Sequence, residues 1–218
     1  PAWTAASWPA PSVLGWFAEV IRRYEQLDAW ARQGRPQIYW FPGFFNPQGF
    51  LTSVRQEITR SHAQGGGSAA WALDRVETRT DVRAFEYKPG QPFEDREALP
   101  ESKAVLIYGL SLEGASWNLK GRVLEDAIKG DIFRDLPVMC VYAGLIGEKR
   151  DDGAKKGRGA KAQNFFKCPV YKYPRRTDNF FVFDVDLPCA ESSEKTGNVV
   201  YDNTFFRMRG VCLLLSQE

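Results

Sequence analysis

Few side chains of this 218-residue sequence have types that could carry out bond chemistry. The single histidine, His62, is the one base that a Ser-His-Asp or Cys-His hydrolase could use. It lies near the predicted end of a helix, where a solvated imidazole is favoured by the helix dipole. Asp184 and Asp186 share one face of a predicted strand and could hold a cation or exchange protons. No histidine or third carboxylate accompanies this pair in sequence, so we expect no catalytic residue and no metal ligand.

A run of three glycines, residues 65–67, is the segment most similar to a phosphate-binding loop. A P-loop follows a strand and ends in glycine, lysine and a hydroxyl residue, whereas these glycines follow a predicted helix and precede Ser68. We therefore interpret them as a flexible hinge. No Walker motif occurs elsewhere, so we expect no cofactor to bind this segment.

Cysteine usage and apolar run lengths exclude two further classes of protein. The four cysteines, Cys140, Cys168, Cys189 and Cys212, form no CxxC pair, so zinc spacing is absent and we expect reduced, mostly buried thiols. The longest apolar runs are much shorter than the roughly 20 residues that cross a bilayer. We expect no membrane partner.

The most charged stretch, residues 149–161, has six basic and two acidic residues, although the net charge of the whole sequence is only +2. The basic residues are Lys149, Arg150, Lys155, Lys156, Arg158 and Lys161. Nucleic-acid grooves interleave such residues with aromatic rings, and this stretch has none, so we expect no nucleic-acid partner. We interpret it as a solvated loop, with contact to an acidic protein surface as the alternative.

Two amphipathic helices are predicted in the first third of the sequence. Ser12 caps the first helix and Gly34 ends it. Its apolar stripe, at three- and four-residue steps, consists of Val13, Leu14, Phe17, Val20, Ile21, Tyr24, Leu27 and Trp30. The second helix begins at Asn46-Pro47, runs to about His62, and buries Phe50, Leu51, Val54 and Ile58.

Beyond the glycines the apolar pattern changes to strands. Six strands are predicted, at residues 105–112, 138–143, 168–173, 180–187 and 211–215 and within 73–78. In the fourth, Phe181, Phe183, Val185 and Leu187 alternate with the two aspartates. No long helix separates these strands, which favours antiparallel pairing in a curled sheet or small barrel.

Three tryptophans near the start of the sequence lie outside the regular apolar patterns of the predicted helices and strands. Trp3 and Trp8 lie in a proline-rich lead-in, and Trp16 falls beside the stripe of the first helix. They could cover the core of this protein, or they could dock onto a partner, because aromatic anchors dominate interfaces.

Several segments, in order, resemble one known family. Residues 40–52, Trp-Phe-Pro-Gly-Phe-Phe-Asn-Pro-Gln-Gly-Phe-Leu-Thr, resemble the signature of the C-terminal domain of dynein heavy chains. The resemblance continues through residues 71–74, 108–117, 136–138, 168–172 and 209–214. The Asn-Pro-Gln form and residues 54–60 and 174–178 are most similar to axonemal heavy chains of the outer-arm gamma type.

The resemblance implies a fold and a function. It implies an α+β fold in which N-terminal amphipathic helices, residues 1–64, precede an incomplete six-stranded, mostly antiparallel β-barrel, residues 65–218. Axonemal dyneins are ATP-driven, minus-end-directed microtubule motors of cilia and flagella, and the resemblance implies that this domain docks on the AAA+ ring of the same heavy chain and modulates motor output. Trp3, Trp8 and Trp16 are the expected docking residues.

The resemblance also implies where the chemistry and partners of the whole motor lie. ATP and Mg would bind elsewhere in a much longer polypeptide, in which Glu218 stands at or near the C-terminus. Microtubules and axonemal dynein subunits would be reached through that full-length motor, in the cytoskeleton of a ciliary or flagellar axoneme. Two alternatives stay open: a module that contacts tubulin tails through residues 149–161, and a stand-alone hydrolase.

Overall fold

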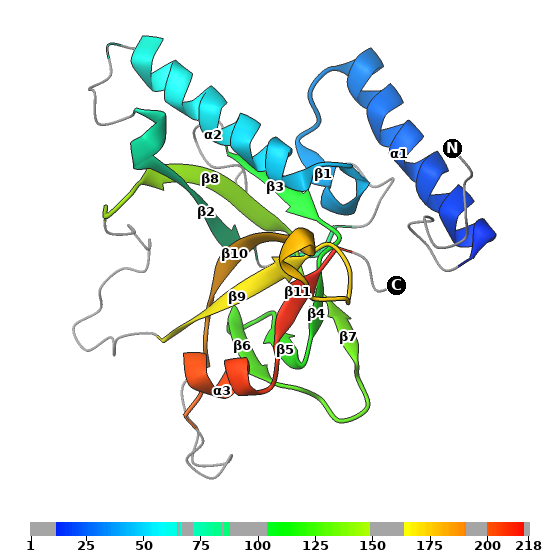
Figure 1. Ribbon diagram of the computed structural model, residues 1–218, viewed down its shortest axis with the longest axis vertical. Helices are drawn as coiled ribbons and strands as arrows, with labels where there is room; N and C mark the ends of the chain where they lie inside the picture. The colour runs from blue at the N-terminus through cyan, green and yellow to red at the C-terminus, as the bar shows by residue number, and fades with distance from the viewer. Residues whose placement is uncertain are drawn as a thin grey trace.

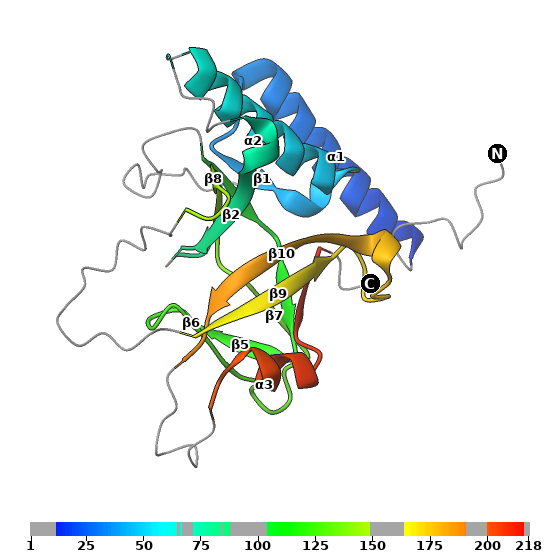
Figure 2. The same cartoon turned by 60° about the vertical axis from the view of Figure 1, so that its left-hand side comes forward.

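The computed structural model describes residues 12–64, 66, 72–83, 85–87, 104–148, 164–190 and 200–215. Its α+β fold places two long helices at one end of a group of small sheets and a short helix at the other (Figures 1 and 2). The helices are α1 (Val13–Gln33), α2 (Pro47–Gln64) and α3 (Asn203–Met208). The strands are β1 (Ile38–Trp40), β2 (Val76–Val82), β3 (Val105–Tyr108), β4 (Ser111–Glu113), β5 (Ala115–Asn118), β6 (Val123–Asp126), β7 (Phe133–Asp135), β8 (Met139–Leu145), β9 (Phe165–Tyr171), β10 (Phe181–Pro188) and β11 (Cys212–Leu214).

Both long helices begin and end where the sequence predicts. The Ser12 side chain accepts a hydrogen bond from the backbone N–H of Gly15 at 3.0 Å, and α1 ends at Gly34, whose φ is +87°. The Asn46 side chain similarly accepts from Gly49 at 2.8 Å at the start of α2. These side chains satisfy backbone donors that a helix start leaves without partners.

Helix α2 packs on the sheets through the residues that the sequence predicts. Leu51, Val54 and Ile58 are buried, and Phe50 is partly buried against the same core cluster. That cluster also contains Ile107 of β3 and Leu213 of β11, so α2 and the strands share one core. The predicted boundary between residues 1–64 and 65–218 stays a prediction.

The sheet beneath α2 has the strand order β1-β3-β8-β2. Strand β8 is antiparallel to both of its neighbours, and Met139, Cys140 and Val141 at its start are fully buried. A central strand covered on both faces needs a continuous apolar run rather than alternation, as predicted for this segment. Strand β1 pairs in parallel with β3 at the edge, with Tyr39 opposite Ile107.

A second sheet has the order β10-β9-β11-β4-β7, and β5 pairs with β6 in a separate hairpin. Strand β11 lies in the middle, parallel to β9 and antiparallel to β4. Its three residues are all buried, in agreement with the apolar run predicted there. Pairing is therefore mostly antiparallel, with two parallel exceptions.

The number of strands differs from the prediction: the described residues contain eleven strands rather than six. The predicted strand 105–112 is two strands, because the backbone turns at Gly109, whose φ is +92°, and passes from one sheet to the other. The alternation predicted for β10 is interrupted by a register shift between Phe181 and Phe183, which buries Val182. No closed barrel is found among these strands, so the incomplete barrel stays a prediction.

Candidate functional site

Helix α1 is attached to the rest of the molecule by a row of mostly polar side chains. Glu19, Arg23, Gln26 and Trp30 are partly buried and recur at four- and three-residue steps, which places them on one face of the helix. Trp30 packs edge-on against Tyr39, with ring centroids 5.3 Å apart. In Figures 1 and 2 the helix runs along the outside of the molecule.

The Gln26 side chain binds the edge of the sheet at Trp40. Its oxygen accepts a hydrogen bond from the Trp40 backbone N–H at 2.7 Å, and its nitrogen donates to the Trp40 carbonyl at 3.3 Å. This pair of bonds satisfies backbone groups of an edge strand, which are otherwise open to pairing with another strand. A Cβ on Gly43 would lie 2.8 Å from the Gln26 nitrogen, so this close approach needs glycine there.

Cationic side chains add to the attachment. The Arg22 guanidinium lies over the Trp40 ring, 4.0 Å from its centroid, and 5.8 Å from that of Tyr108. Arg23 forms an ion pair with Glu19 of the same helix at 2.7 Å and donates a hydrogen bond to the Pro42 carbonyl at 3.5 Å. A guanidinium stacked on tryptophan is stabilised by the negative face of the ring. The contact with the body is therefore made mainly by directional polar interactions, from this row and from the neighbouring Arg22.

The apolar stripe of α1 faces away from the body. No residue of this helix is fully buried, and Leu14 and Tyr24 are 80% and 63% exposed. The exposed stripe consists of Val13, Leu14, Phe17, Val20, Ile21, Tyr24 and Leu27. Monomeric soluble proteins rarely expose a continuous apolar surface of this kind, so the stripe is the candidate interaction site. Sequence reasoning finds the stripe but not the direction in which it points.

The structure describes only one of the three tryptophans that are predicted from the sequence to dock on a partner. Trp16 is partly buried, and its ring packs edge-on against Phe17 at 5.0 Å. It lies three residues before Glu19, in register with the row that faces the body. Trp3 and Trp8 lie outside the described residues, as do all six basic residues of the stretch 149–161. Their roles stay predictions.

The residues considered for catalysis are not brought together. His62 lies near the end of α2, with Nδ1 3.0 Å from the carbonyl of Ile58. Asp184 forms an ion pair with Lys167 of β9 at 3.3 Å, which makes its carboxylate part of a cross-strand pair. Within the described ranges, no group of three or more histidine, cysteine, aspartate or glutamate residues could hold a metal ion.

All four cysteines are buried and unpaired, as predicted. Burial raises the pKa of Cys189 and of Cys212 to about 11 and that of Cys168 well above its ordinary value. A reactive cysteine needs the opposite environment, with nearby positive charge and solvent access. These thiols serve as small apolar core residues. The described helices include none that is long and apolar enough to cross a bilayer.

The segments that carry the family resemblance form the contacts described above. Residues 40–52 provide Trp40, the buried Phe41 and the start of α2, while residues 209–214 provide the central strand β11. The family model for the C-terminal domain of dynein heavy chains matches residues 1–215.

Similar proteins cover most of this sequence. It is 33% and 34% identical, over 97% of its length, to dynein axonemal heavy chains 8 and 5 of Mus musculus. It is 38% identical, over 69% of its length, to the dynein gamma chain of the flagellar outer arm of Chlamydomonas reinhardtii. It spans only 3% to 4% of these relatives. Because the family model matches almost the whole sequence, the protein belongs to the family of C-terminal domains of dynein heavy chains.

Proposed function

We propose that this protein is the C-terminal domain of an axonemal dynein heavy chain, most similar to the outer-arm gamma type, and that it acts by docking on the AAA+ ring of the same heavy chain. The motor would work on microtubules, with other axonemal dynein subunits, in a cilium or flagellum. The relatives support this assignment because they are axonemal heavy chains, including an outer-arm gamma chain.

One observation supports docking above all others: the outward apolar stripe of α1. A helix normally turns such a stripe toward its own core. Here the polar row faces the body, so the stripe is available to another surface. Since the sequence spans about 4% of its relatives, most of a heavy chain lies outside it and could provide that surface.

In this proposal the domain is a mechanical element and not a catalyst. The two larger sheets would form the incomplete barrel, and α1 would bridge it to the ring through the outward stripe. Trp16 would contribute from the edge of that stripe, where its ring packs against Phe17. The free energy of that interface would shift the conformational equilibrium of the ring during ATP turnover. ATP and Mg would be bound by other parts of the heavy chain.

The test uses a full-length motor that carries this domain, with Leu14→Gln and Ile21→Gln introduced together. Glutamine has nearly the helix propensity of leucine, so α1 stays helical while its stripe becomes polar. We expect the release of the domain from the ring, measured by limited proteolysis, and a change in ATPase rate and microtubule gliding speed. A Trp16→Ala variant tests the predicted tryptophan contact in the same assays.

The matched control is Met208→Gln on α3, because Met208 is 84% exposed and, like Leu14, apolar but lies at the other end of the molecule. We expect this motor to behave as wild type. Unaltered proteolysis, ATPase and gliding in the Leu14→Gln, Ile21→Gln motor would refute docking through α1. Equal effects from the control would show that the stripe has no special role.

A further inference from the structure

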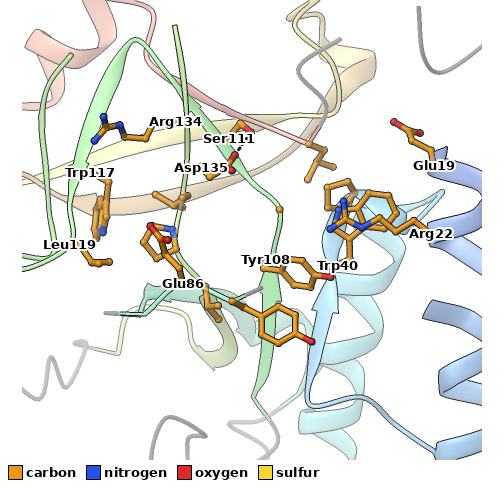
Figure 3. A pocket seen from close by; sticks show the side chains of 17 residues that line it. Glu19, Arg22, Trp40, Glu86, Tyr108, Ser111, Trp117, Leu119, Arg134 and Asp135 are labelled. Carbon is orange, nitrogen blue, oxygen red and sulfur yellow. Dashed lines mark hydrogen bonds between the residues drawn. The ribbon is translucent and has the colours of Figure 1, made fainter. Parts of the chain in front are cut away.

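Two arginines of α1 contact different parts of the body. Arg22 lies over the Trp40 ring beside a groove of about 750 Å³, and Figure 3 shows Glu19 one turn away on the same helix. The lining of this groove carries charges of both signs, so its charge selects no ligand. Arg23 instead reaches Phe45, with its Cζ 5.5 Å from the centroid of that ring. The surface around Phe45 is the part of the molecule that extends the docking stripe.

Phe45 presents an aromatic ring to solvent just before α2. It is 77% exposed, whereas the preceding Phe44 stacks on Phe50 against the core, with ring centroids 4.2 Å apart. The core is therefore filled by the first phenylalanine of the pair and not by the second. A single exposed phenylalanine is ordinary, but one that continues a larger apolar surface indicates an interaction surface.

The Phe45 ring continues the exposed stripe of α1. Val20 precedes Arg23 by three residues and Leu27 follows it by four, so both are neighbours of Arg23 on the helix surface. Val20 is 39% exposed and Leu27 is 52% exposed, while the Arg23 side chain is only 12% exposed. Because Arg23 contacts Phe45, the stripe and the ring form one apolar surface that passes from the helix to the body.

Lys172 places a positive charge beside this surface. Its Nζ donates a hydrogen bond to the Phe45 carbonyl at 3.3 Å, and its backbone N–H donates to the Phe180 carbonyl at 2.8 Å. The second bond closes the turn between β9 and β10 and fixes the position of Lys172. None of the ion pairs among the described residues includes Lys172.

The charges around Lys172 favour an acidic group on a partner. Burial and the positive charge of Arg23 lower the pKa of Lys172, and the negative charge of Glu19 opposes them. Glu19 is already paired with Arg23 at 2.7 Å, so two cations share one carboxylate. A partly desolvated ammonium without its own carboxylate is stabilised by a negative charge brought close to it.

We propose that the surface that docks on the stripe of α1 also covers Phe45 and places one acidic side chain on Lys172. This inference rests on the proposed docking within the same heavy chain, most of which lies outside a sequence that spans about 4% of its relatives. The occupant is an apolar surface of that heavy chain with an aspartate or glutamate at its margin. Because Lys172 and Phe45 belong to the body, this contact joins α1 and the body to one partner surface.

The experiment is carbodiimide cross-linking of a full-length motor that carries this domain, followed by mass spectrometry. The reagent joins an amine directly to a carboxylate that it contacts. We expect an amide between Lys172 and an aspartate or glutamate of the same heavy chain outside this domain. Lys167 is the internal control, because it lies five residues earlier and pairs with Asp184 at 3.3 Å, to which it should be joined. In the Leu14→Gln, Ile21→Gln motor, the Lys172 product should fall by about tenfold and the Lys167 product should not change.

Variants test the ring and the charge separately, by limited proteolysis of the same motor. Phe45→Gln should release the domain about tenfold faster, because a buried ring is lost from the interface. Ile132→Gln is its matched control, since Ile132 is 70% exposed but lies between β6 and β7, away from this surface. Lys172→Arg keeps the charge and should dock as wild type does, whereas Lys172→Glu should release the domain faster.

Four results would overturn the inference while the wild-type domain stays protected on the ring, and they would leave the proposed function standing. They are a Lys172 product with Glu19 or another polypeptide only, no Lys172 product beside a normal Lys167 product, an equal Lys172 yield in the Leu14→Gln, Ile21→Gln motor, and wild-type release of Phe45→Gln. A wild-type domain that is cleaved as readily as the Leu14→Gln, Ile21→Gln variant would refute the proposed docking and this inference with it.

Discussion

Replacing Gly109 with alanine tests how closely the turn between β3 and β4 packs on Trp40, the residue to which Gln26 and Arg22 of α1 bind. Gly109 has a φ of +92°, and a Cβ there would lie 2.8 Å from the Trp40 ring and 3.0 Å from Pro42. The left-handed backbone costs alanine about 1–2 kcal/mol. Overpacking against the Trp40 ring, on which Arg22 is also stacked, adds about 1–3 kcal/mol. We expect the free energy of unfolding to fall by about 2–5 kcal/mol.

Gly130 provides the matched control. Its φ is +98°, and a Cβ there would meet nothing within 4 Å, so Gly130→Ala carries the backbone cost without the steric one. The lower entropy of the unfolded state affects both variants equally and cancels in the comparison. Urea unfolding should therefore separate the variants by about 1–3 kcal/mol, with unchanged m values. Equal destabilisation would refute the close packing of Gly109 on Trp40.

Three further predictions concern the core and the helix ends. Burial raises the pKa of Cys189 and Cys212 from 9.0 to about 11, so the unfolded thiols ionise first. The free energy of unfolding should therefore fall between pH 9 and 11 by about 1.4 kcal/mol per pH unit for each thiol. Replacing Cys189 and Cys212 with alanine should make the free energy of unfolding, measured by urea titration, less dependent on pH in this range. Asp202→Ala removes the side-chain cap of α3 and should lower stability by about 1 kcal/mol in the same assay; no loss would contradict the cap. Gln26→Leu should speed hydrogen exchange of the Trp40 amide at least tenfold, and unchanged exchange would contradict the bond between them.

The helices were predictable because their signals are local. Ser12 and Gly34 bound α1, and Asn46 with Pro47 starts α2, within a few residues of the groups that they satisfy. Most strands that were not predicted from the sequence are three or four residues long. A strand of that length is too short to show an alternation of apolar and polar residues. Strand β1 is found only through its pairing with β3, about 70 residues later in the sequence, and local patterns carry no information on such contacts.

The residues of the candidate site on α1 could be predicted from the sequence, but the direction in which the apolar stripe points could not. The sequence contains both faces of α1, and a stripe of seven large apolar residues would ordinarily be assigned to the core. The structure instead turns Arg23 and Gln26 inward, because Trp40 offers them a ring face and two backbone groups.

The two faces of α1 differ in the kind of contact that they make, and this difference bears on the proposed mechanism. Hydrogen bonds from Gln26 and the stacked Arg22 are directional and fix the helix on the body. The outer stripe is apolar, and the burial of each half-exposed residue contributes about 1 kcal/mol without fixing orientation. A surface in the same heavy chain would dock with a high effective concentration, so several such contacts suffice to hold it. Movement of that surface would then be transmitted through α1 to Trp40 and the sheets, while the outer contact adjusts.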